Sequence, residues 1–391
     1  MTELPFSFPP SIEPFVLPAL YIVILVAVFP LIAGYIVLLE RKVMADIQVR
    51  LGPMRVGPHG LLQPIADAVK LLIKEDIIPA KADRMVFWLA PVISVVTALV
   101  ALSLVPFSKY FFVADTNVGL LFLLSITSVG ILGIILGGWS SNSHYPLLGA
   151  LRSTAQLVSY EVALGFALIG GLMVAGTLSM QQMVHAQLEQ QMWFIFYQPV
   201  AFVIYFIAAL AETNRTPFDM PEAESEIVAG YHTEYSGFRF ALYFLAEYAN
   251  MVVVSSIAVT LFLGGWLRPF PNVRLLDFLN YAPILAMFVL AFFVFLGASR
   301  ERRPIDKMGL AGLGAVCALI GLLFLVPAVL DWVQGLFWFV LKVFLVLYTF
   351  IWIRFTVPRY RYDQLMRIGW RWLIPLAMAN VIVTAIVMIL F

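Results

Sequence analysis

The sequence has little charge and almost no cysteine. Only 12% of its 391 residues are charged and 62% are hydrophobic, whereas a soluble domain carries about 25% charged residues. This composition excludes a soluble globular enzyme and a disordered chain. The single cysteine, Cys317, cannot build a disulfide framework, an iron–sulfur cluster or a zinc site from this chain alone. Because 24 Lys and Arg balance 23 Asp and Glu, the basic surface typical of nucleic-acid binding is absent as well.

Histidine is also scarce. The four histidines are too far apart in the sequence to suggest a haem or a metal pair: His59, His144, His185 and His232. The chain has no nucleotide-binding motif either. We therefore expect this chain to bind no metal and no redox cofactor, so that it cannot carry electrons itself.

What the sequence does have is long apolar runs. A helix that crosses the hydrocarbon core needs about 20 mostly apolar residues. Ten segments qualify: 15–39, 85–107, 117–138, 154–176, 196–212, 238–265, 281–298, 309–330, 333–356 and 371–391. The first carries no cleavage site after its apolar run and reads as a retained span. The prediction is an all-α polytopic membrane protein, a single membrane domain over 1–391 with about ten transmembrane helices plus an interfacial amphipathic helix.

The basic residues indicate the orientation. Eighteen of the 24 Lys and Arg fall in alternate loops on one side, which the positive-inside rule identifies as cytoplasmic. The opposite side holds only Lys109, Arg268 and Arg274. Both termini are therefore predicted to lie on the non-cytoplasmic side. The longest cytoplasmic stretches, 40–84 and 213–237, are the expected functional loops.

The first cytoplasmic loop contains an amphipathic segment from Gly60 to Lys74. Its apolar residues recur at helical spacing, with Asp67, Lys70 and Lys74 on the other face. One interpretation is an interfacial anchor whose lysines meet anionic lipid headgroups. The other is a cavity wall, because charges also gather around a nearby Gly/Pro turn at membrane level.

The second loop concentrates acidic residues around a single base, Arg215. The acids are Glu212, Asp219, Glu222, Glu224, Glu226 and Glu234. Crowded carboxylates in a low-dielectric place cannot all ionise, so some would exchange protons near neutral pH. The alternative is a solvated acidic loop, which is the commoner meaning of a charge run. Interleaved proline and aromatic residues favour a packed loop.

Three ionisable residues lie inside predicted spans. Glu161 and Glu247 sit about 12 to 14 Å along their helices from the cytoplasmic end, and Lys342 about 18 Å. Placing such a group in the membrane costs at least about 2.5 to 3.5 kcal/mol, so it normally faces a wet or paired interior. Tyr160 and Tyr243 would extend hydrogen-bonded relays beside the two acids. The groups form either a proton path from the cytoplasmic interface or a static Glu–Lys pair.

Seven stretches form long and specific motifs: Leu39–Lys42, Gln48–Pro53, Gly60–Asp67, Ala211–Asp219, Glu222–Glu226, Phe244–Asn250 and Arg359–Gln364. Together they resemble one family, the H subunit of bacterial respiratory complex I, NADH-quinone oxidoreductase. The resemblance runs from the first span to the last.

The resemblance implies a membrane subunit that forms much of a quinone chamber and couples quinone reduction to proton translocation. It places near that chamber Glu40, Arg41, Arg50, Asp67, Phe218, Asp219, Glu222, Glu224 and Glu226. It assigns the proton path to Glu161, Glu212, Glu234 and Glu247, to which our reading of the intramembrane charges adds Lys342. It also implies quinone as substrate, a bacterial inner membrane as location, and partner subunits that hold the NADH site, the flavin and the iron–sulfur clusters.

The role of one region and the function of the chain both leave alternatives open. Residues 270–332 depart from the family pattern and read as an inserted helical hairpin, whose role the sequence does not indicate. A membrane-bound hydrogenase or formate hydrogenlyase would use a similar subunit. An ion-coupled transporter would explain buried Glu and Lys without a quinone, although no repeated halves are visible. A purely structural anchor would leave the intramembrane acids unexplained.

Overall fold

The chain folds into a bundle of long helices. The computed structural model describes residues 13–220, 229–300 and 303–390, and within these ranges it has helices but no strands. In this described part of the chain, nine segments are long and apolar enough to cross a membrane: Pro18–Ile47, Arg84–Ser103, Gly119–Ser140, His144–Ala175, Gly237–Phe262, Arg274–Arg300, Asp306–Leu323, Pro327–Thr356 and Tyr362–Leu390. The predicted class, an all-α polytopic membrane protein, is confirmed.

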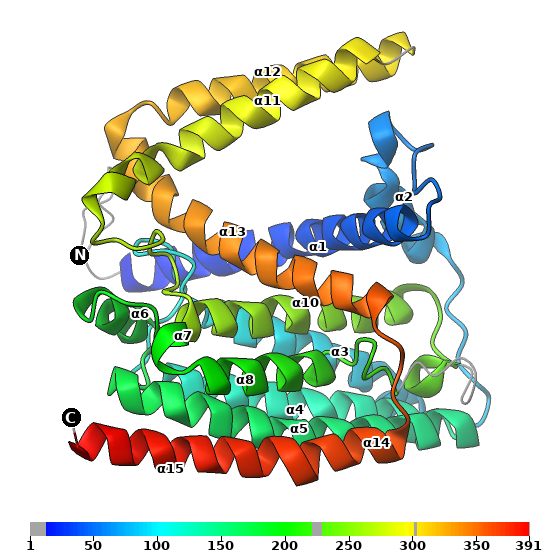
Figure 1. The fold of residues 1–391 in the computed structure, drawn as a ribbon. Coiled ribbons are helices and arrows are strands. Elements are labelled where there is room, and N and C mark those ends of the chain that lie inside the picture. The colour runs from blue at the N-terminus through cyan, green and yellow to red at the C-terminus, as the bar shows by residue number, and fades with distance from the viewer. Residues whose placement is uncertain (1–12, 221–228, 301–302, 391) are drawn as a thin grey trace.

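The fifth predicted span, 196–212, is shorter than expected. It consists of the 4-residue α7 (Phe194–Tyr197) followed by the 14-residue α8 (Pro199–Glu212). Pro199 starts α8 because proline fits the first turn of a helix but not its interior. At 1.5 Å per residue α8 is only about 21 Å long. The first turns of α1 (Glu13–Ile47) and the end of α15 (Ile374–Leu390) nevertheless lie at the same end of the bundle (Figure 1). The short helix α8 therefore adds one further pass along the bundle to those of the nine longer segments.

The centre of the bundle is α10 (Gly237–Phe262). It packs against α1, α3 (Arg84–Ser103), α8 and α13 (Pro327–Thr356), and nearly all of its second half is buried. The outer side of the bundle is formed by α4 (Gly119–Ser140), α5 (His144–Ala175) and α15 (Figure 1). Because α10 is covered on several sides, ionisable groups on it face other helices rather than lipid.

Small residues allow α3 and α4 to approach closely. A side chain at Gly133 would collide with Ser94 and with the carbonyl of Ala90, and one at Gly137 would collide with the hydroxyl of Tyr243. Such contacts are the usual way in which membrane helices gain packing without a hydrophobic driving force between them. They bring α3, α4 and α10 together beside the acidic loop.

The predicted amphipathic helix is α2 (Gln63–Ile73), which follows a short 3-10 turn, η1 (Pro58–Gly60). It packs against α1 and α10. At the other end of the chain, α14 (Tyr362–Arg367) continues through a π-helical turn, η4 (Ile368–Leu373), into α15. A short helix, α6 (Met180–Glu189), and the turn η2 (Gly230–His232) complete the connections around the bundle.

The predicted hairpin over 270–332 is formed by α11 (Ala282–Arg300) and α12 (Pro304–Leu323), with η3 (Arg274–Tyr281) leading into it. The two helices pack on each other and extend away from the rest of the bundle (Figure 1). Phe295 of α11 lies against Gly314 of α12, where a larger residue would crowd the ring. The start of α12 contacts η1, so the hairpin reaches the first cytoplasmic loop.

Candidate functional site

An apolar cavity of about 480 Å³ lies between α1, α2 and α10. Most of its lining is aliphatic or aromatic: Ala33, Val37, Leu38, Ala68, Leu71, Leu242, Phe244 and Leu245 are among the residues. The polar side chains that reach it are few, namely Gln63 and Lys70 of α2, the pair Arg41 and Asp67, and Tyr248 of α10. Such a space, largely apolar with a few placed polar groups, is typical of a site for a small hydrophobic molecule.

Two of the predicted chamber residues face each other at this cavity. Arg41 Nη1 lies 2.7 Å from Asp67 Oδ2, and Gln63 donates a 3.1 Å hydrogen bond to the other carboxylate oxygen. Lys70 lies 3.7 Å from the same carboxylate. These contacts hold α2 against the end of α1, so the helix predicted as either anchor or cavity wall does line a cavity.

Tyr248 connects the apolar cavity to a buried carboxylate. Its hydroxyl donates a 2.6 Å hydrogen bond to Glu40 Oε2, and only 6% of Glu40 is exposed. Arg215 Nη1 lies 3.1 Å from Glu40 Oε1, and Arg354 of α13 also contacts this oxygen. Because a buried charge is costly unless it is paired, two guanidinium groups and a hydroxyl account for the burial of Glu40.

Arg215 carries the connection onward. Its Nε atom lies 2.9 Å from Glu247 Oε1, while its guanidinium also covers the ring of Tyr248 at 4.6 Å. Only 4% of Arg215 is exposed. One guanidinium therefore bridges Glu40 of α1 and Glu247 of α10. The lone base of the acidic loop is the central counter-charge of the site.

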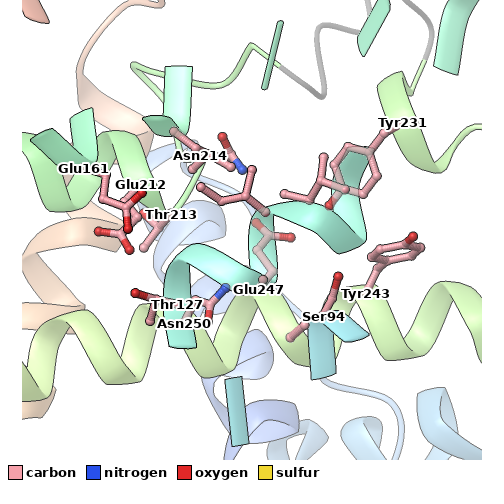
Figure 2. A pocket seen from close by; sticks show the side chains of 15 residues that line it. Ser94, Thr127, Glu161, Glu212, Thr213, Asn214, Tyr231, Tyr243, Glu247 and Asn250 are labelled. Carbon is pink, nitrogen blue, oxygen red and sulfur yellow. The ribbon is translucent and has the colours of Figure 1, made fainter. Parts of the chain in front are cut away.

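A second, smaller cavity of about 50 Å³ continues from Glu247. Its polar lining includes Glu161 and Glu212 together with Thr213, Asn214, Thr127, Ser94, Asn250, Tyr231 and Tyr243 (Figure 2). A site needs about 10–15 Å³ to hold a water molecule, so this polar space is large enough for a few. Ser128 donates a hydrogen bond to Glu161. Three of the four acids predicted for the proton path therefore line one cavity.

Gln156 of α5 holds the start of the acidic loop. It is fully buried, and its amide nitrogen donates 2.7 Å hydrogen bonds to the carbonyls of Ala211 and Phe218. Phe218 in turn packs between the rings of Tyr160 and Tyr360, at 5.6 and 5.7 Å. The segment that follows Glu212 and contains Arg215 is thus irregular, and it is packed within the protein.

Aromatic residues flank the polar cavity on the side of η2. Tyr231 packs on Tyr243, Tyr243 on Tyr235, and Tyr235 stacks on Phe87 at 4.0 Å. Burial raises the pKa of Tyr235 and lowers the pKa of the neighbouring His232 to about 4. His232 is therefore neutral at physiological pH.

The tyrosines expected to extend relays bond to carbonyls instead. Tyr243 donates to the Gly133 carbonyl at 3.1 Å, and Tyr160 donates to the Leu365 carbonyl at 3.0 Å. Glu234 is partly buried in the turn after η2 and does not line either cavity. The tyrosine that does bond to a carboxylate of the site is Tyr248.

Lys342 lies apart from these acids. Its ammonium donates to the carbonyls of Leu263, Gly265 and Leu267 at 2.6, 3.0 and 2.6 Å, and it covers the ring of Trp193. Leu263 is 16 residues beyond Glu247 along α10, which is about 24 Å. The partners of Lys342 are therefore carbonyls at the far end of α10, not a carboxylate of the proton path.

The remaining predicted chamber residues are not gathered at the apolar cavity. Arg50 is exposed and donates to Gln48 at 2.6 Å, and Phe218 packs beside Tyr160 as described. Asp219 is partly buried. Glu222, Glu224 and Glu226 lie outside the described residues.

Sequence reasoning missed four residues of the site: Gln156, Arg215 as a bridge, Tyr248 and Arg354. A signal was present for Arg354, because an arginine inside an apolar span needs a counter-charge. The sequence also gave a signal for Arg215, because it is the only base among six acids. Nothing in the sequence pattern distinguished Tyr248 from the other tyrosines.

Comparisons with known proteins find relatives that match nearly the whole chain. A family model described as NADH dehydrogenase matches residues 20–385. The chain is 60% identical to an H subunit of NADH-quinone oxidoreductase from Solibacter usitatus, over 96% of this chain and 97% of that protein. It is 52% identical to an H subunit of the same enzyme from Koribacter versatilis, over 94% and 90% of the two chains. It is 44% identical to the H subunit from Rickettsia bellii, over 100% and 98%.

Proposed function

The chain belongs to the NADH dehydrogenase family, and we propose that it is the subunit of an NADH-quinone oxidoreductase in which quinone binding meets proton translocation. One observation carries this proposal. The apolar cavity is connected through Tyr248, Glu40, Arg215 and Glu247 to the polar cavity that Glu161 and Glu212 line.

The apolar cavity suits a quinone. A quinone headgroup is apolar except for two carbonyl oxygens, and an isoprenoid tail is apolar throughout, so both are favoured by the aliphatic and aromatic walls. Arg41 is a donor at the cavity that would meet a carbonyl oxygen, while the hydroxyl of Tyr248 donates to Glu40 behind the cavity wall. Reduction of the quinone to the quinol takes two electrons and two protons, and partner subunits would deliver the electrons.

The connected charges suit proton movement. A charge that develops in the apolar cavity acts on Glu40 through Tyr248, and a change at Glu40 alters how Arg215 shares its positive charge with Glu247. Each charge in such a row acts on its neighbour, because the two groups are close together and shielded from water. Quinone chemistry at one end would thereby shift protons in the polar cavity at the other end.

The rest of the assignment follows from the relatives' names and from the charge pattern. Those names favour a quinone-linked enzyme over the hydrogenase and transporter alternatives. The NADH site, the flavin and the iron–sulfur clusters would reside in partner subunits. The positive-inside count supports a bacterial inner membrane location with both termini on the non-cytoplasmic side.

Neutralising the acids tests the proton path. Glu247→Gln and Glu161→Gln should each keep the side-chain volume while removing the charge, and should lower the number of protons pumped per NADH in reconstituted vesicles. Glu189→Gln, at an exposed acid on α6, is the matched control. Wild-type pumping by both cavity variants, in complexes that assemble normally on a native gel, would refute the proposed path.

Filling the apolar cavity tests quinone binding separately. Ala68→Phe would place a ring among the residues that line it, so the KM for quinone should rise while the ratio of protons to NADH stays constant. Ala315→Phe, at an exposed position on α12, adds the same ring outside the cavity. An unchanged KM in the Ala68 variant would show that quinone binds elsewhere.

A further inference from the structure

A third cavity, of about 220 Å³, lies at the end of the bundle opposite α2 and belongs to neither part of the proposed site. Four segments meet around it: the chain after α3, the chain after α10, η3 and the first turns of α13. Its polar lining consists of Ser108, Lys109, Tyr110, Arg268, Asn280, Asp331 and Gln334. Trp266 and Trp332 also line it. Because tryptophan and tyrosine are enriched where the bilayer meets water, this composition is typical of the membrane interface.

The walls of this cavity are held in place by their own hydrogen bonds. Arg268 donates to the carbonyls of Leu276 and Pro271 and lies 2.6 Å from Asp277. Gln334 of α13 donates a 2.6 Å hydrogen bond to Asn280. The cavity is therefore preorganised, which lowers the entropy cost of binding a ligand. The charge of Arg268 is also already balanced.

Two opposite charges remain beside one tyrosine. The hydroxyl of Tyr110 donates to Asp331 at 2.8 Å, and this hydrogen bond raises the pKa of Tyr110. The ammonium of Lys109 lies 5.2 Å from the centre of the same ring, and Trp332 stacks on it at 4.9 Å. Lys109 and Asp331 are both exposed, and within the residues that the structure describes no ion pair joins them. Both charges therefore lie near the hydroxyl of Tyr110 without pairing directly with each other.

The placement of Lys109 and Arg268 is unusual for this chain. The non-cytoplasmic side has only three basic residues by the loop count, and two of them line this one cavity. A mixed pair of charges, separated and facing one interfacial cavity, matches a ligand that is itself zwitterionic. A purely anionic headgroup would meet repulsion from Asp331.

We propose that this cavity binds the headgroup of a phosphatidylethanolamine molecule from the outer leaflet. The phosphate would accept hydrogen bonds from Lys109, and the primary ammonium would donate to the second carboxylate oxygen of Asp331. Charge-assisted hydrogen bonds of this kind are about twice as strong as neutral ones. A choline headgroup has no N–H to donate, and a glycerol headgroup lacks the positive charge, so both should bind more weakly.

Native mass spectrometry of the whole purified complex tests this. The complex is stripped of loosely bound lipid and then titrated with phosphatidylethanolamine, phosphatidylcholine or phosphatidylglycerol of matched chain length. The wild type should retain phosphatidylethanolamine preferentially. Lys109→Gln and Asp331→Asn should each weaken its binding roughly tenfold, the equivalent of one charge-assisted hydrogen bond. Arg274→Gln, at the outer-side base that does not line the cavity, should have no effect.

Two results would overturn the proposal. One is equal retention of phosphatidylethanolamine by the wild type and both cavity variants. The other is equal retention of all three lipids by the wild type, which would mean that the ammonium is not recognised. Because Lys109 and Asp331 are exposed, the variants should assemble normally, and unchanged NADH oxidation by the complex would verify that.

Discussion

Removing a single oxygen atom should interrupt the connection between the two cavities. Tyr248→Phe deletes the hydroxyl that donates the 2.6 Å hydrogen bond to Glu40, while the ring stays in position to cover the guanidinium of Arg215. The variant thus keeps the packing of the site and loses its only hydrogen bond between the apolar cavity and Glu40 among the described residues.

The size of the effect follows from that hydrogen bond. A hydrogen bond to a charged group is worth about 1.5–3 kcal/mol. If the same interaction stabilises the transition state for proton transfer at the cavity, its loss slows turnover roughly tenfold to a hundredfold, since about 1.4 kcal/mol is a factor of ten in rate. The kcat for NADH-dependent quinone reduction should fall by that factor, whereas the KM for quinone, which depends mainly on the apolar walls, should change little.

Steady-state rates at varied quinone concentration, measured on the reconstituted complex, separate the two parameters. Tyr205→Phe is a matched control, because this buried tyrosine donates to the backbone carbonyl of Val254 and lines neither cavity of the proposed site. A Tyr248→Phe complex with the wild-type kcat would refute the role of Tyr248 as the link. A rise in KM alone would mean that the hydroxyl only binds quinone.

Three further predictions concern residues outside this link. Gln156→Leu should reduce proton pumping because the segment with Arg215 loses two 2.7 Å hydrogen bonds. The control Gln187→Leu, at another buried glutamine that donates to a carbonyl, should lower stability without reducing pumping. Equal pumping in the two variants would contradict a role of Gln156 in positioning Arg215. Lys342→Met leaves buried carbonyls unsatisfied, so it should lower the thermal stability of the complex by about 2 kcal/mol. The number of protons pumped per NADH should not change. Normal stability with reduced pumping would return Lys342 to the proton path. The pKa of His232 in the folded protein is about 4, below its ordinary 6.5, so its contribution to stability is fully present above pH 6.5. As the pH falls from 6.5 to 4, the free energy of unfolding should drop by up to about 3 kcal/mol. If His232→Gln does not flatten the melting profile over this range, another group is responsible.

The course of the chain through the membrane could be predicted from the sequence, because it depends on local composition. Apolar runs located the nine long helices, and the spacing of residues from Gly60 to Lys74 indicated α2. The predicted bounds differ from the observed ones where apolar and polar residues mix. The helix α5 begins at His144 rather than at 154, and the predicted fifth span breaks before Pro199.

The contacts of the site could be predicted only in part. Glu161 and Glu247 were recognisable because an acid inside an apolar run is costly. The pairing of Glu40 with Arg354 was not, since these residues are 314 positions apart, and helices that are apolar on all sides give no periodic signal of which face meets which neighbour. Tyr248 is one of 15 tyrosines, and only its position beside Glu40 distinguishes it.

The shortness of α8 has a consequence for biosynthesis. A segment of 10–14 apolar residues is too short to enter a bilayer as an independent span, and α8 has 14 residues and ends in Glu212. It should therefore leave the translocon only together with its neighbours, α5 before it and α10 after it, against which it packs. Glu161, Glu212 and Glu247 belong to these three helices, so the acids would enter the membrane already facing one another, and none of them would have to meet lipid on its own.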